Sequence, residues 1–372
     1  MGVHHGHILR LLRDGGPLSR ADMARKSGLS STTLTHISAQ LINDGDIREI
    51  EVNEPARVGR PAQAVRLVAE SRKVAGIHIG AGGGQVVITD MVAGPQASGV
   101  FDYDVTNPED IATKACSHLA KLIASSGFET KDLIGVGVGI PCAVDATRRF
   151  ALGSTIVDWR NVAFADLFER MLGLPTVVEH NVSAMALAES RYGAGRSASG
   201  LLYIYLRTGL GAGLIVDGEP FRPGGRGAVE LGHIQVDPGG LSCACGNSGC
   251  LETFACEEAL MRMAGLSGAV PTDLFDRLRA IPDAWNLTVR HLTNALATAV
   301  NLLAPDLIIL GGHLGHAPDA LFDQLISGLS QRVAGHLRDR LNLARGSFGA
   351  QAGAIGGAAV ALDQFFYSGA LH

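Results

Sequence analysis

The sequence has no apolar run that approaches the roughly 18–20 residues needed to cross a bilayer, and its N-terminus has no signal-peptide pattern. These absences argue against membrane insertion and favour a cytoplasmic protein whose thiols stay reduced. Aromatic residues are also scarce, at 5%, although hydrophobic residues make up 47% and glycine occurs 48 times. This composition is typical of an α/β protein with many tight turns and unlike that of a disordered chain.

The chain also lacks a net positive charge, since its formal charge is -5. A negative charge spread evenly over the surface would disfavour binding to nucleic acid. The charge is uneven, however, because residues 1–70 carry nine Lys or Arg against eight Asp or Glu, together with four His. This mild asymmetry sets the N-terminal segment apart, and the length of 372 residues predicts two or three domains.

The first 70 residues follow the pattern of a winged helix-turn-helix domain, which is mainly α-helical. Helical spacing of apolar residues predicts a first helix over residues 5–14. A second helix is predicted from Ser19 to Gly28 and a third from Ser30 to Gly45, with serines as caps and glycines as stops. Two helices joined by a turn at Gly28 are typical of DNA-binding domains, and a small helical bundle for dimerisation is the alternative.

A wing is predicted after the third helix. Its two strands are expected over residues 47–52 and 64–68, around the Gly-Arg-Pro of residues 59–61. An arginine held beside glycine and proline is well shaped to enter a narrow minor groove. The third helix would place short hydroxyls near phosphates and amide or imidazole groups near base edges. The predicted DNA-contacting residues are Ser31, Thr32, Thr33, Thr35, His36, Gln40, Arg57 and Arg60.

From residue 73 onward the pattern changes to strands separated by glycine-rich turns. Apolar runs flank the turn of residues 80–84, and similar runs flank the turn of residues 208–213. A third glycine turn follows the apolar run of residues 307–310. The first two hairpins are similar and lie about 125 residues apart, which predicts two duplicated lobes with a ligand cleft between them.

One cluster of residues predicts a metal site. Three of the six cysteines lie within eight residues, and a histidine precedes them, in the pattern His-x9-Cys-x-Cys-x4-Cys. Three thiolates and one imidazole match the closed tetrahedral set of a structural Zn2+ site. A redox pair or unrelated buried thiols are the alternatives. The predicted zinc ligands are His233, Cys243, Cys245 and Cys250.

This cluster, the Gly-Ile-Pro of residues 139–141, the glycine turns and the N-terminal helix-turn-helix together resemble the ROK family of repressors, open reading frames and sugar kinases. The resemblance covers essentially the whole chain. It implies a two-lobed α/β actin-like ATPase fold, of the ribonuclease H-like class, in a homodimer or homotetramer. The implied division is a DNA-binding domain over residues 1–70, a first lobe over 71–190 and a second lobe over 191–372, which contains the zinc loop of residues 233–252.

The resemblance also implies where a sugar would bind. Family members hold ring hydroxyls with the Glu of Gly-Glu-x-Gly-His, with its His and with the Glu after Cys-Leu. These positions match Glu230, His233 and Glu252 here. His180 and Asn181 stand where the family kinases have an Asn-Asp pair, and both still offer hydrogen-bonding groups to a sugar. A purely structural role for the two glutamates, around the zinc, is the alternative.

The kinase residues themselves are only partly retained. The first hairpin of the kinases carries an Asp for Mg2+ where this chain has His78, and the catalytic Asp is replaced by Asn181. Mg2+ prefers oxygen ligands, and an amide cannot act as the general base, a role worth about 10²–10⁴-fold in rate. Thr208, Gly209 and Gly211 match a remnant of the phosphate loop, which either holds an anion through backbone N–H groups or only forms a tight hairpin.

The sequence therefore predicts a kinase-inactive, zinc-containing transcriptional regulator, a repressor of carbohydrate-metabolism genes. Its predicted partners are a double-stranded DNA operator, read as two half-sites by two protomers, and a sugar or sugar-phosphate effector. Two alternatives stay open at this point. One is an active ATP-dependent sugar kinase with an accessory DNA-binding domain, and the other is a regulator sequestered by a transporter protein.

Overall fold

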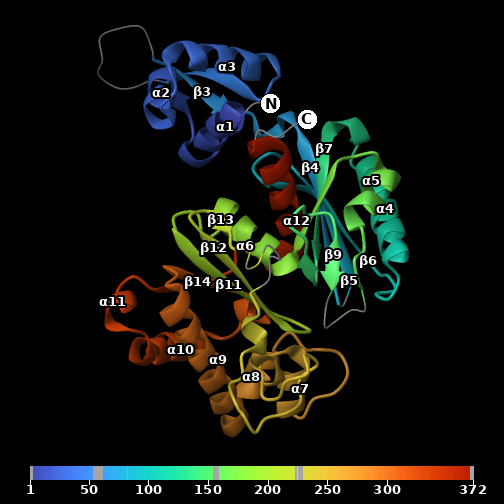
Figure 1. Ribbon diagram of the computed structural model, residues 1–372, viewed down its shortest axis with the longest axis vertical. Coiled ribbons are helices and arrows are strands. Elements are labelled where there is room, and N and C mark those ends of the chain that lie inside the picture. Colours follow the sequence, from blue (N-terminus) through green and yellow to red (C-terminus); the bar gives the residue numbers. More distant parts are fainter. Residues whose placement is uncertain are drawn as a thin grey trace.

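The computed structural model describes residues 3–52, 62–81, 83–153, 159–222, 224 and 229–368. Figure 1 shows an N-terminal domain in blue, a first lobe in cyan and green, and a second lobe in yellow and orange. The N-terminal domain lies at one end of the molecule, beside the C-terminal end of the chain. Within the described ranges, no helix is both long and apolar enough to cross a bilayer.

The N-terminal domain is a winged helix-turn-helix, as predicted. Its helices are α1 (Val3–Gly15), α2 (Arg20–Ser27) and α3 (Ser31–Asn43). The strands β1 (Leu18–Ser19), β2 (Ile47–Val52) and β3 (Ala62–Leu67) form a sheet in the order β1-β3-β2. Strand β1, which pairs with β3, is an element that the sequence pattern did not predict.

The helix boundaries of this domain follow from local capping. The hydroxyl of Ser19 accepts a hydrogen bond from the backbone N–H of Asp22 at 3.1 Å. The hydroxyl of Ser30 accepts one from the N–H of Thr33 at the same distance. Gly28 ends α2 in the left-handed conformation, with φ of 71°. The predicted starts of α2 and α3 and the predicted stop of α2 are confirmed.

The first lobe is built on a five-stranded sheet in the order β10-β7-β4-β5-β6. Helices α4 (Pro108–Ser125) and α5 (Phe164–Leu172) cover its outer face, and the small hairpin of β8 (Ala143–Val144) and β9 (Ala151–Gly153) lies near its edge. The strands of the sheet are β4 (Lys73–Gly80), β5 (Gly83–Thr89), β6 (Pro95–Phe101), β7 (Leu133–Ile140) and β10 (Thr176–His180).

The second lobe repeats this topology with the order β13-β12-β11-β14-β15. In each sheet an antiparallel hairpin is extended by a third strand on one side and by two parallel strands on the other. The predicted duplication of lobes is therefore confirmed. The strands are β11 (Gly200–Leu206), β12 (Leu210–Val216), β13 (Glu219–Pro220), β14 (Leu307–Gly312) and β15 (Asn342–Arg345).

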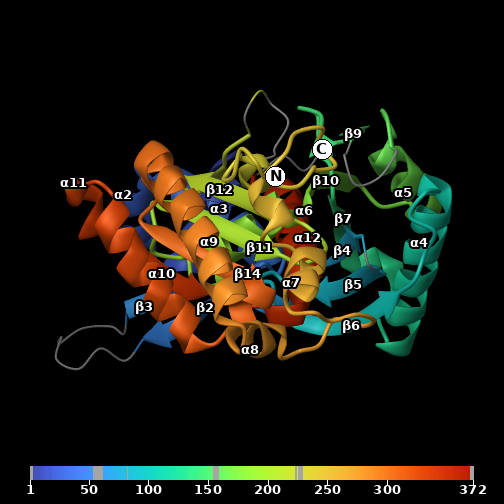
Figure 2. The same cartoon turned by 90° about the horizontal axis from the view of Figure 1, so that it is seen from below.

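Among the described residues, five α-helices belong to the second lobe. The long helix α9 packs against α10 and shares a hydrophobic cluster with the outer face of the second sheet (Figure 2). The helices are α7 (Glu257–Met263), α8 (Leu274–Arg279), α9 (Pro282–Leu303), α10 (Asp319–Arg332) and α11 (Gly335–Arg338).

Two helices lie between the lobes. Helix α6 (Asn181–Tyr192) packs against β11 and β12 of the second sheet and against α12 (Ala352–Leu362). Helix α12 in turn packs on β4 and β7 of the first sheet, and the π-helical segment η8 (Asp363–Tyr367) continues it. The predicted division placed residues 352–367 in the second lobe. In the structure the small side chains of α12 fit against the glycine-containing first sheet, so this helix joins that sheet to α6.

A buried ion pair holds the N-terminal domain to the start of the first lobe. The Asp46 carboxylate is fully buried, and it accepts hydrogen bonds from Arg72 Nε at 2.7 Å and Arg72 Nη2 at 2.9 Å. Ser71 Oγ also donates to it at 3.3 Å. Because Asp46 follows α3 and Arg72 immediately precedes β4, the pair fixes the connection between the two parts of the chain.

We expect Arg72→Ala to lower the free energy of unfolding by about 3 kcal/mol, because it leaves the Asp46 carboxylate buried without its charged partner. Chemical denaturation measures this loss. The matched control is Arg25→Ala, which breaks an exposed pair with Asp22 and should lower the value by less than about 0.5 kcal/mol. Equal losses in the two variants would contradict the structural role of the buried pair.

Candidate functional site

The candidate metal site lies between the short helices η4 (Leu231–His233) and η5 (Leu251–Thr253). One ligand atom from each of the four predicted ligands lies within 4.8 Å of the others. Cys243 Sγ is 3.6 Å from His233 Nδ1, and Cys245 Sγ is 3.6 Å from Cys250 Sγ. The fold thus brings together one imidazole and three thiols that are spread over 18 positions of the sequence.

These distances fit a tetrahedral zinc ion. With Zn–S bonds of about 2.3 Å and Zn–N bonds of about 2.0 Å, neighbouring ligand atoms lie roughly 3.5–3.8 Å apart. A disulfide would need two sulfurs about 2.0 Å apart, and the six cysteines are free thiols. The cluster therefore fits a closed structural zinc site better than a redox pair.

Glycine allows the zinc loop to fold back. Gly246 and Gly249 have φ of 94° and 64°, in the left-handed region that residues with a Cβ rarely adopt. A Cβ on Gly249 would also lie only 1.5 Å from the carbonyl oxygen of Asp237. This position therefore excludes any other residue, and the loop returns Cys250 to the same side as His233.

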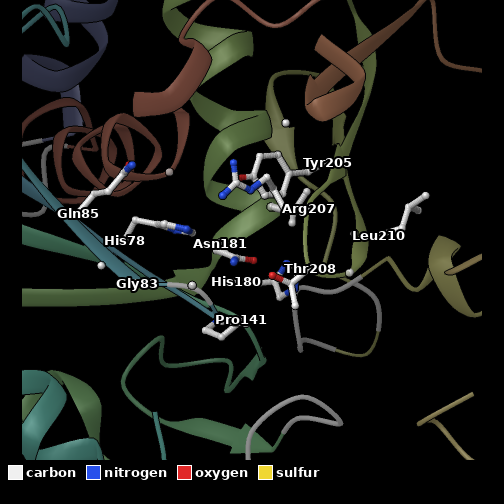
Figure 3. A pocket seen from close by; sticks show the side chains of 18 of the residues that line it. His78, Gly83, Gln85, Pro141, His180, Asn181, Tyr205, Arg207, Thr208 and Leu210 are labelled. Carbon is white, nitrogen blue, oxygen red and sulfur yellow. The ribbon is translucent and has the colours of Figure 1, made fainter. Parts of the chain in front are cut away.

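A cavity of about 830 Å³ opens between the two sheets and reaches the zinc cluster at His233. Figure 3 shows His78 and Gln85 of the first lobe on one side, and Tyr205, Arg207 and Thr208 of the second lobe on the other. The lining residues that were predicted from the sequence are His180, Asn181, Glu230, His233, Glu252, Thr208, Gly209 and Gly211. The predicted sugar positions and phosphate-loop remnant thus share one cavity.

His233 links the metal cluster to the cavity. Its Nδ1 faces Cys243, whereas its Nε2 is 3.9 Å from Glu230 Oε2. The Glu230 side chain is 68% exposed, so its carboxylate is accessible to a ligand. Glu252 is held more firmly, because its Oε2 accepts a hydrogen bond from the backbone N–H of Leu210 at 2.8 Å. One oxygen of Glu252 therefore supports the β11–β12 turn.

His180 and Asn181 lie where strand β10 passes into helix α6, at the junction of the lobes. The preceding Glu179 is 1% exposed and pairs with Arg222 of the second lobe at 2.5 Å, which anchors this junction. Burial lowers the pKa of His180, so that its ring is neutral near pH 7. Neutral imidazole and carboxamide groups both donate and accept hydrogen bonds, as recognition of a sugar hydroxyl requires.

The predicted phosphate-loop remnant is shorter than expected. The sequence pattern placed the turn over residues 208–213, but strand β12 already begins at Leu210, and Gly211 lies within it. A Cβ on Gly211 would come within 2.7 Å of Val182 on α6, so packing of the helix accounts for this glycine. Of the three predicted residues, Thr208 and Gly209 form the turn itself, and Thr208 Oγ1 donates to Glu257 at 3.4 Å.

His78 stands where the resemblance to the family kinases predicts their Mg2+-organising acid. The residue is 9% exposed, and its ring lies against Gly353, near the start of α12. Burial, and secondarily the charge of Arg207, lower its pKa from 6.5 to about 4. A neutral, buried imidazole does not replace a carboxylate as a ligand for Mg2+, which prefers oxygen.

The lowered pKa of His78 predicts a loss of stability in acid. Below pH 6.5 His78 binds a proton in the unfolded chain, but in the folded chain it does so only near pH 4. The free energy of unfolding therefore falls as the pH falls from 6.5 to about 4. We expect His78 to contribute about 2 kcal/mol to the difference in unfolding free energy between pH 7 and pH 5. Urea titrations at both pH values measure the unfolding free energy. His180 and His291 also have lowered pKa values and add to its pH dependence, so the His78→Gln variant is needed to isolate the part due to His78. The same pH dependence in His78→Gln would contradict the assignment.

Helix α3 presents most of the predicted DNA-contacting side chains to solvent. Ser31, Thr32, Thr35 and His36 are exposed, while Thr33 is half-buried and its hydroxyl contacts that of Ser30 at 2.8 Å. Gln40 is exposed near the end of the helix, and its Oε1 is 2.8 Å from His5 Nε2 of α1. The wing residues Arg57 and Arg60 lie outside the described residues. The exposed first turns of α3 have the form of a recognition helix, whose N-terminal residues reach base edges.

Several cavity residues were missed by reasoning from the sequence. Tyr205 lies near the end of strand β11 and Arg207 directly follows the strand, where its Nε pairs with Glu257 Oε1 at 3.1 Å. His313 Nε2 lies 2.5 Å from the same carboxylate. The only available signal was proximity to the turn at Thr208 and to the glycines after β14, where side chains at the carboxyl ends of parallel strands face a cleft.

Comparisons with known proteins agree with this arrangement. A winged helix-turn-helix DNA-binding profile matches residues 4–48, and the ROK family profile matches residues 74–364. The DNA-binding transcriptional repressor Mlc of Escherichia coli is 25% identical, over 98% of this chain and 94% of Mlc. The xylose repressor of Bacillus subtilis is 24% identical, over 98% and 96% of the two chains.

Solved structures show the same combination of parts. A crystal structure of a ROK family transcriptional regulator, described as a homologue of Escherichia coli Mlc, superposes with a TM-score of 0.85 at 25% identity and covers 99% of this chain and 96% of its own. A ROK family glucokinase from Streptomyces griseus, in complex with glucose and AMPPNP, gives a TM-score of 0.65 at 26% identity. It covers 77% of this chain and 98% of its own.

The fold and the site define a two-lobed, actin-like α/β protein that carries an N-terminal winged helix-turn-helix domain. The chain belongs to the ROK family, since the family profile spans more than half of its length. The predicted family and fold class are therefore confirmed. The matches that extend over nearly the whole chain include repressors, whereas the glucokinase match covers only 77% of it.

Proposed function

We propose that this protein is a DNA-binding transcriptional repressor of sugar-utilisation genes, and that a sugar or sugar phosphate in the cavity changes its affinity for DNA. One observation carries the proposal. A single chain combines an exposed face of α3 with a cavity lined by the polar side chains predicted to contact a sugar, and it has a histidine and an amide where the resemblance to the kinases predicts acids. Such a cavity can recognise a carbohydrate without phosphorylating it.

Recognition of the sugar rests on Glu230, His233 and Glu252 in the second lobe and on His180 and Asn181 at the lobe junction. The carboxylates accept hydrogen bonds from vicinal hydroxyls, and the amide both donates and accepts. Zinc on the four-residue cluster would hold the His233 imidazole by Nδ1, leaving Nε2 directed toward the ligand. A ligand that contacts both lobes favours one relative lobe position, which is the differential binding that an effector requires.

Recognition of DNA rests on helix α3 in each of two protomers. A two-fold dimer would place two such helices in successive major grooves, and the effector would alter their spacing. The names of the relatives support this proposal, since they include an N-acetylglucosamine repressor and xylose repressors. Sequestration by a transporter protein is an outcome that the sugar screen below distinguishes.

Two binding experiments test the proposal. Selection of duplexes from a random library by the full-length chain should enrich one sequence with two-fold symmetry, and Thr32→Ala with His36→Ala should abolish the enrichment. A thermal-shift screen with N-acetylglucosamine, xylose, glucose and their phosphates should raise the midpoint for at least one of them. Failure to enrich any duplex at low salt would refute DNA binding. No shift with any sugar would favour sequestration by a protein partner instead.

A further inference from the structure

Arg13, in the last turn of α1, forms a buried contact between the DNA-binding domain and the core of the molecule. Its side chain is 4% exposed, and its guanidinium carbon lies 4.5 Å from the ring centre of Tyr367 and 5.4 Å from that of Tyr192. Asp14 accepts hydrogen bonds from its Nε and Nη2, at 2.7 Å and 3.0 Å, and so fixes the plane of the group. A buried cation between two aromatic rings depends strongly on the position of both.

The two tyrosines end the two helices that begin at the cavity. Tyr192 is the last residue of α6, whose first residue, Asn181, lines the cavity. Tyr367 is the last residue of η8, which continues α12, and Gly353 in the first turn of α12 lines the cavity as well. In Figure 1, α12 runs from a position close to α1 to the space between the lobes. The 12 residues of α6 span about 18 Å at 1.5 Å per residue.

The two helices pack closely against each other. A Cβ on Gly356 of α12 would come within 2.8 Å of the backbone nitrogen of Met185 on α6, so the two backbones touch. Their far ends are also tied together. Arg191 pairs with Glu219 of β13 at 2.9 Å and with Asp363 of η8 at 3.6 Å. Movement of the helix pair at the cavity would therefore displace Tyr192 and Tyr367 together at the far ends.

The DNA-binding domain shares its hydrophobic interior with this helix pair. One continuous cluster of buried side chains contains Ile8 and Leu9 of α1 together with Ile355 of α12 and Phe366 of η8. Tyr367 is further held by a hydrogen bond that its hydroxyl donates to the carbonyl of Met91 at 2.5 Å. Helix α1, and with it the winged helix-turn-helix domain, therefore packs on the ends of α6 and η8 in addition to the Asp46–Arg72 connection.

We propose that Arg13 is the positioning residue through which occupancy of the cavity sets the orientation of the DNA-binding domain. The inference rests on the proposed function, because it supplies the physical link between the sugar site and α3. A ligand that draws the lobes together moves the cavity ends of α6 and α12, the linked far ends move with them, and the guanidinium group follows the two tyrosine rings. Arg13 touches neither sugar nor DNA in this arrangement.

Hydrogen–deuterium exchange of the full-length, ligand-free chain tests the mechanical part. In Arg13→Ala, exchange of the α1 amides should be at least about tenfold faster than in the unaltered chain, with exchange in β11 and β14 unchanged. Arg13→Lys keeps the charge without the planar group, so its α1 amides should exchange at a rate between those of Arg13→Ala and the unaltered chain. Tyr192→Phe keeps the ring, and its α1 amides should exchange as fast as those of the unaltered chain.

Arg10→Ala is the matched control. It removes a cation from the same helix, at a side chain without a polar or ring contact among the described residues, and should leave the exchange of the α1 amides unchanged. Unchanged α1 exchange in Arg13→Ala would overturn the proposal.

Affinity for the selected duplex, with and without N-acetylglucosamine, glucose or xylose, tests the coupling. The sugar that changes the Kd of the unaltered chain at least about tenfold should change that of Arg13→Ala less than twofold, while calorimetry finds the same sugar affinity in both. If Arg13 had only a structural role, Arg13→Ala would not lose the effect of sugar on duplex binding while keeping the same affinity for sugar. If Arg13→Ala keeps the full response, the proposal fails. If no sugar changes duplex binding by any variant, the sugar response in the proposed function fails, and the exchange experiment alone decides the role of Arg13.

Discussion

Cys243→Ser is expected to release zinc and to lower the thermal midpoint by roughly 10 °C. Binding of a structural zinc ion by four such ligands contributes about 10–16 kcal/mol, and loss of one thiolate removes a large part of it. The loop would then no longer hold His233 and Glu252 in place, and Glu252 supports the β11–β12 turn through the N–H of Leu210. Loss of metal should therefore also abolish the response to sugar. Atomic absorption and differential scanning calorimetry measure the two effects.

Cys256→Ser is the matched control for the zinc site. Cys256 is buried, whereas Cys243 is half-buried, and it lies outside the cluster, at the start of α7, where its sulfur accepts a hydrogen bond from the N–H of Ala259. Serine is a favourable residue at that position of a helix, so this variant should keep one zinc ion per chain and a midpoint within a few degrees. A Cys243→Ser protein that keeps its stability and its sugar response without zinc would contradict the structural role of the metal.

The unaltered chain is expected to transfer no phosphate from ATP to any hexose or N-acetylhexosamine. Asn181 cannot accept the proton of a sugar hydroxyl, and His78 does not organise Mg2+. Restoring both acids in His78→Asp with Asn181→Asp should raise turnover by at least about 10²-fold over the unaltered chain, because the two lobes share the fold of a ROK family glucokinase. A coupled assay for ADP, with mass spectrometry of the sugar product, measures it.

The single variants separate the two roles. Asn181→Asp alone supplies the base but no acid for Mg2+, and His78→Asp alone supplies the acid but no base, so each should stay near background. Turnover by the unaltered chain at about 1 s⁻¹ or faster would be that of a working kinase and would overturn the repressor proposal.

Local chemistry explains why much of the fold could be predicted from the sequence. Ser19, Ser30 and Gly28 determine helix ends through hydrogen bonds and backbone conformations that involve only their neighbours. The hairpins of both lobes follow from apolar runs that flank glycine. The four zinc ligands are close enough in sequence for their spacing to indicate a shared ion.

The parts that the sequence did not predict depend on contacts between distant residues. Helix α12 packs on the first sheet because its glycines and alanines allow a close approach to the strands. The composition of the helix alone does not predict which sheet it packs on. Gly211 is a strand residue that packs against Val182, although its spacing resembles a turn. Arg207 pairs with Glu257, and Arg13 contacts the rings of Tyr192 and Tyr367. These partners are distant along the chain, and the periodicity of a single sequence does not predict such contacts.

Fluorescence anisotropy of the selected duplex, titrated with the full-length chain with and without the sugar that shifts its melting midpoint, tests the central proposal most directly. The proposed function predicts a change in Kd of at least about tenfold when the sugar is present, with no ADP formed in a parallel sample that contains ATP. The proposed function would be contradicted if the chain binds the sugar but binds the duplex with the same Kd in its presence and absence, or if it does not bind the duplex.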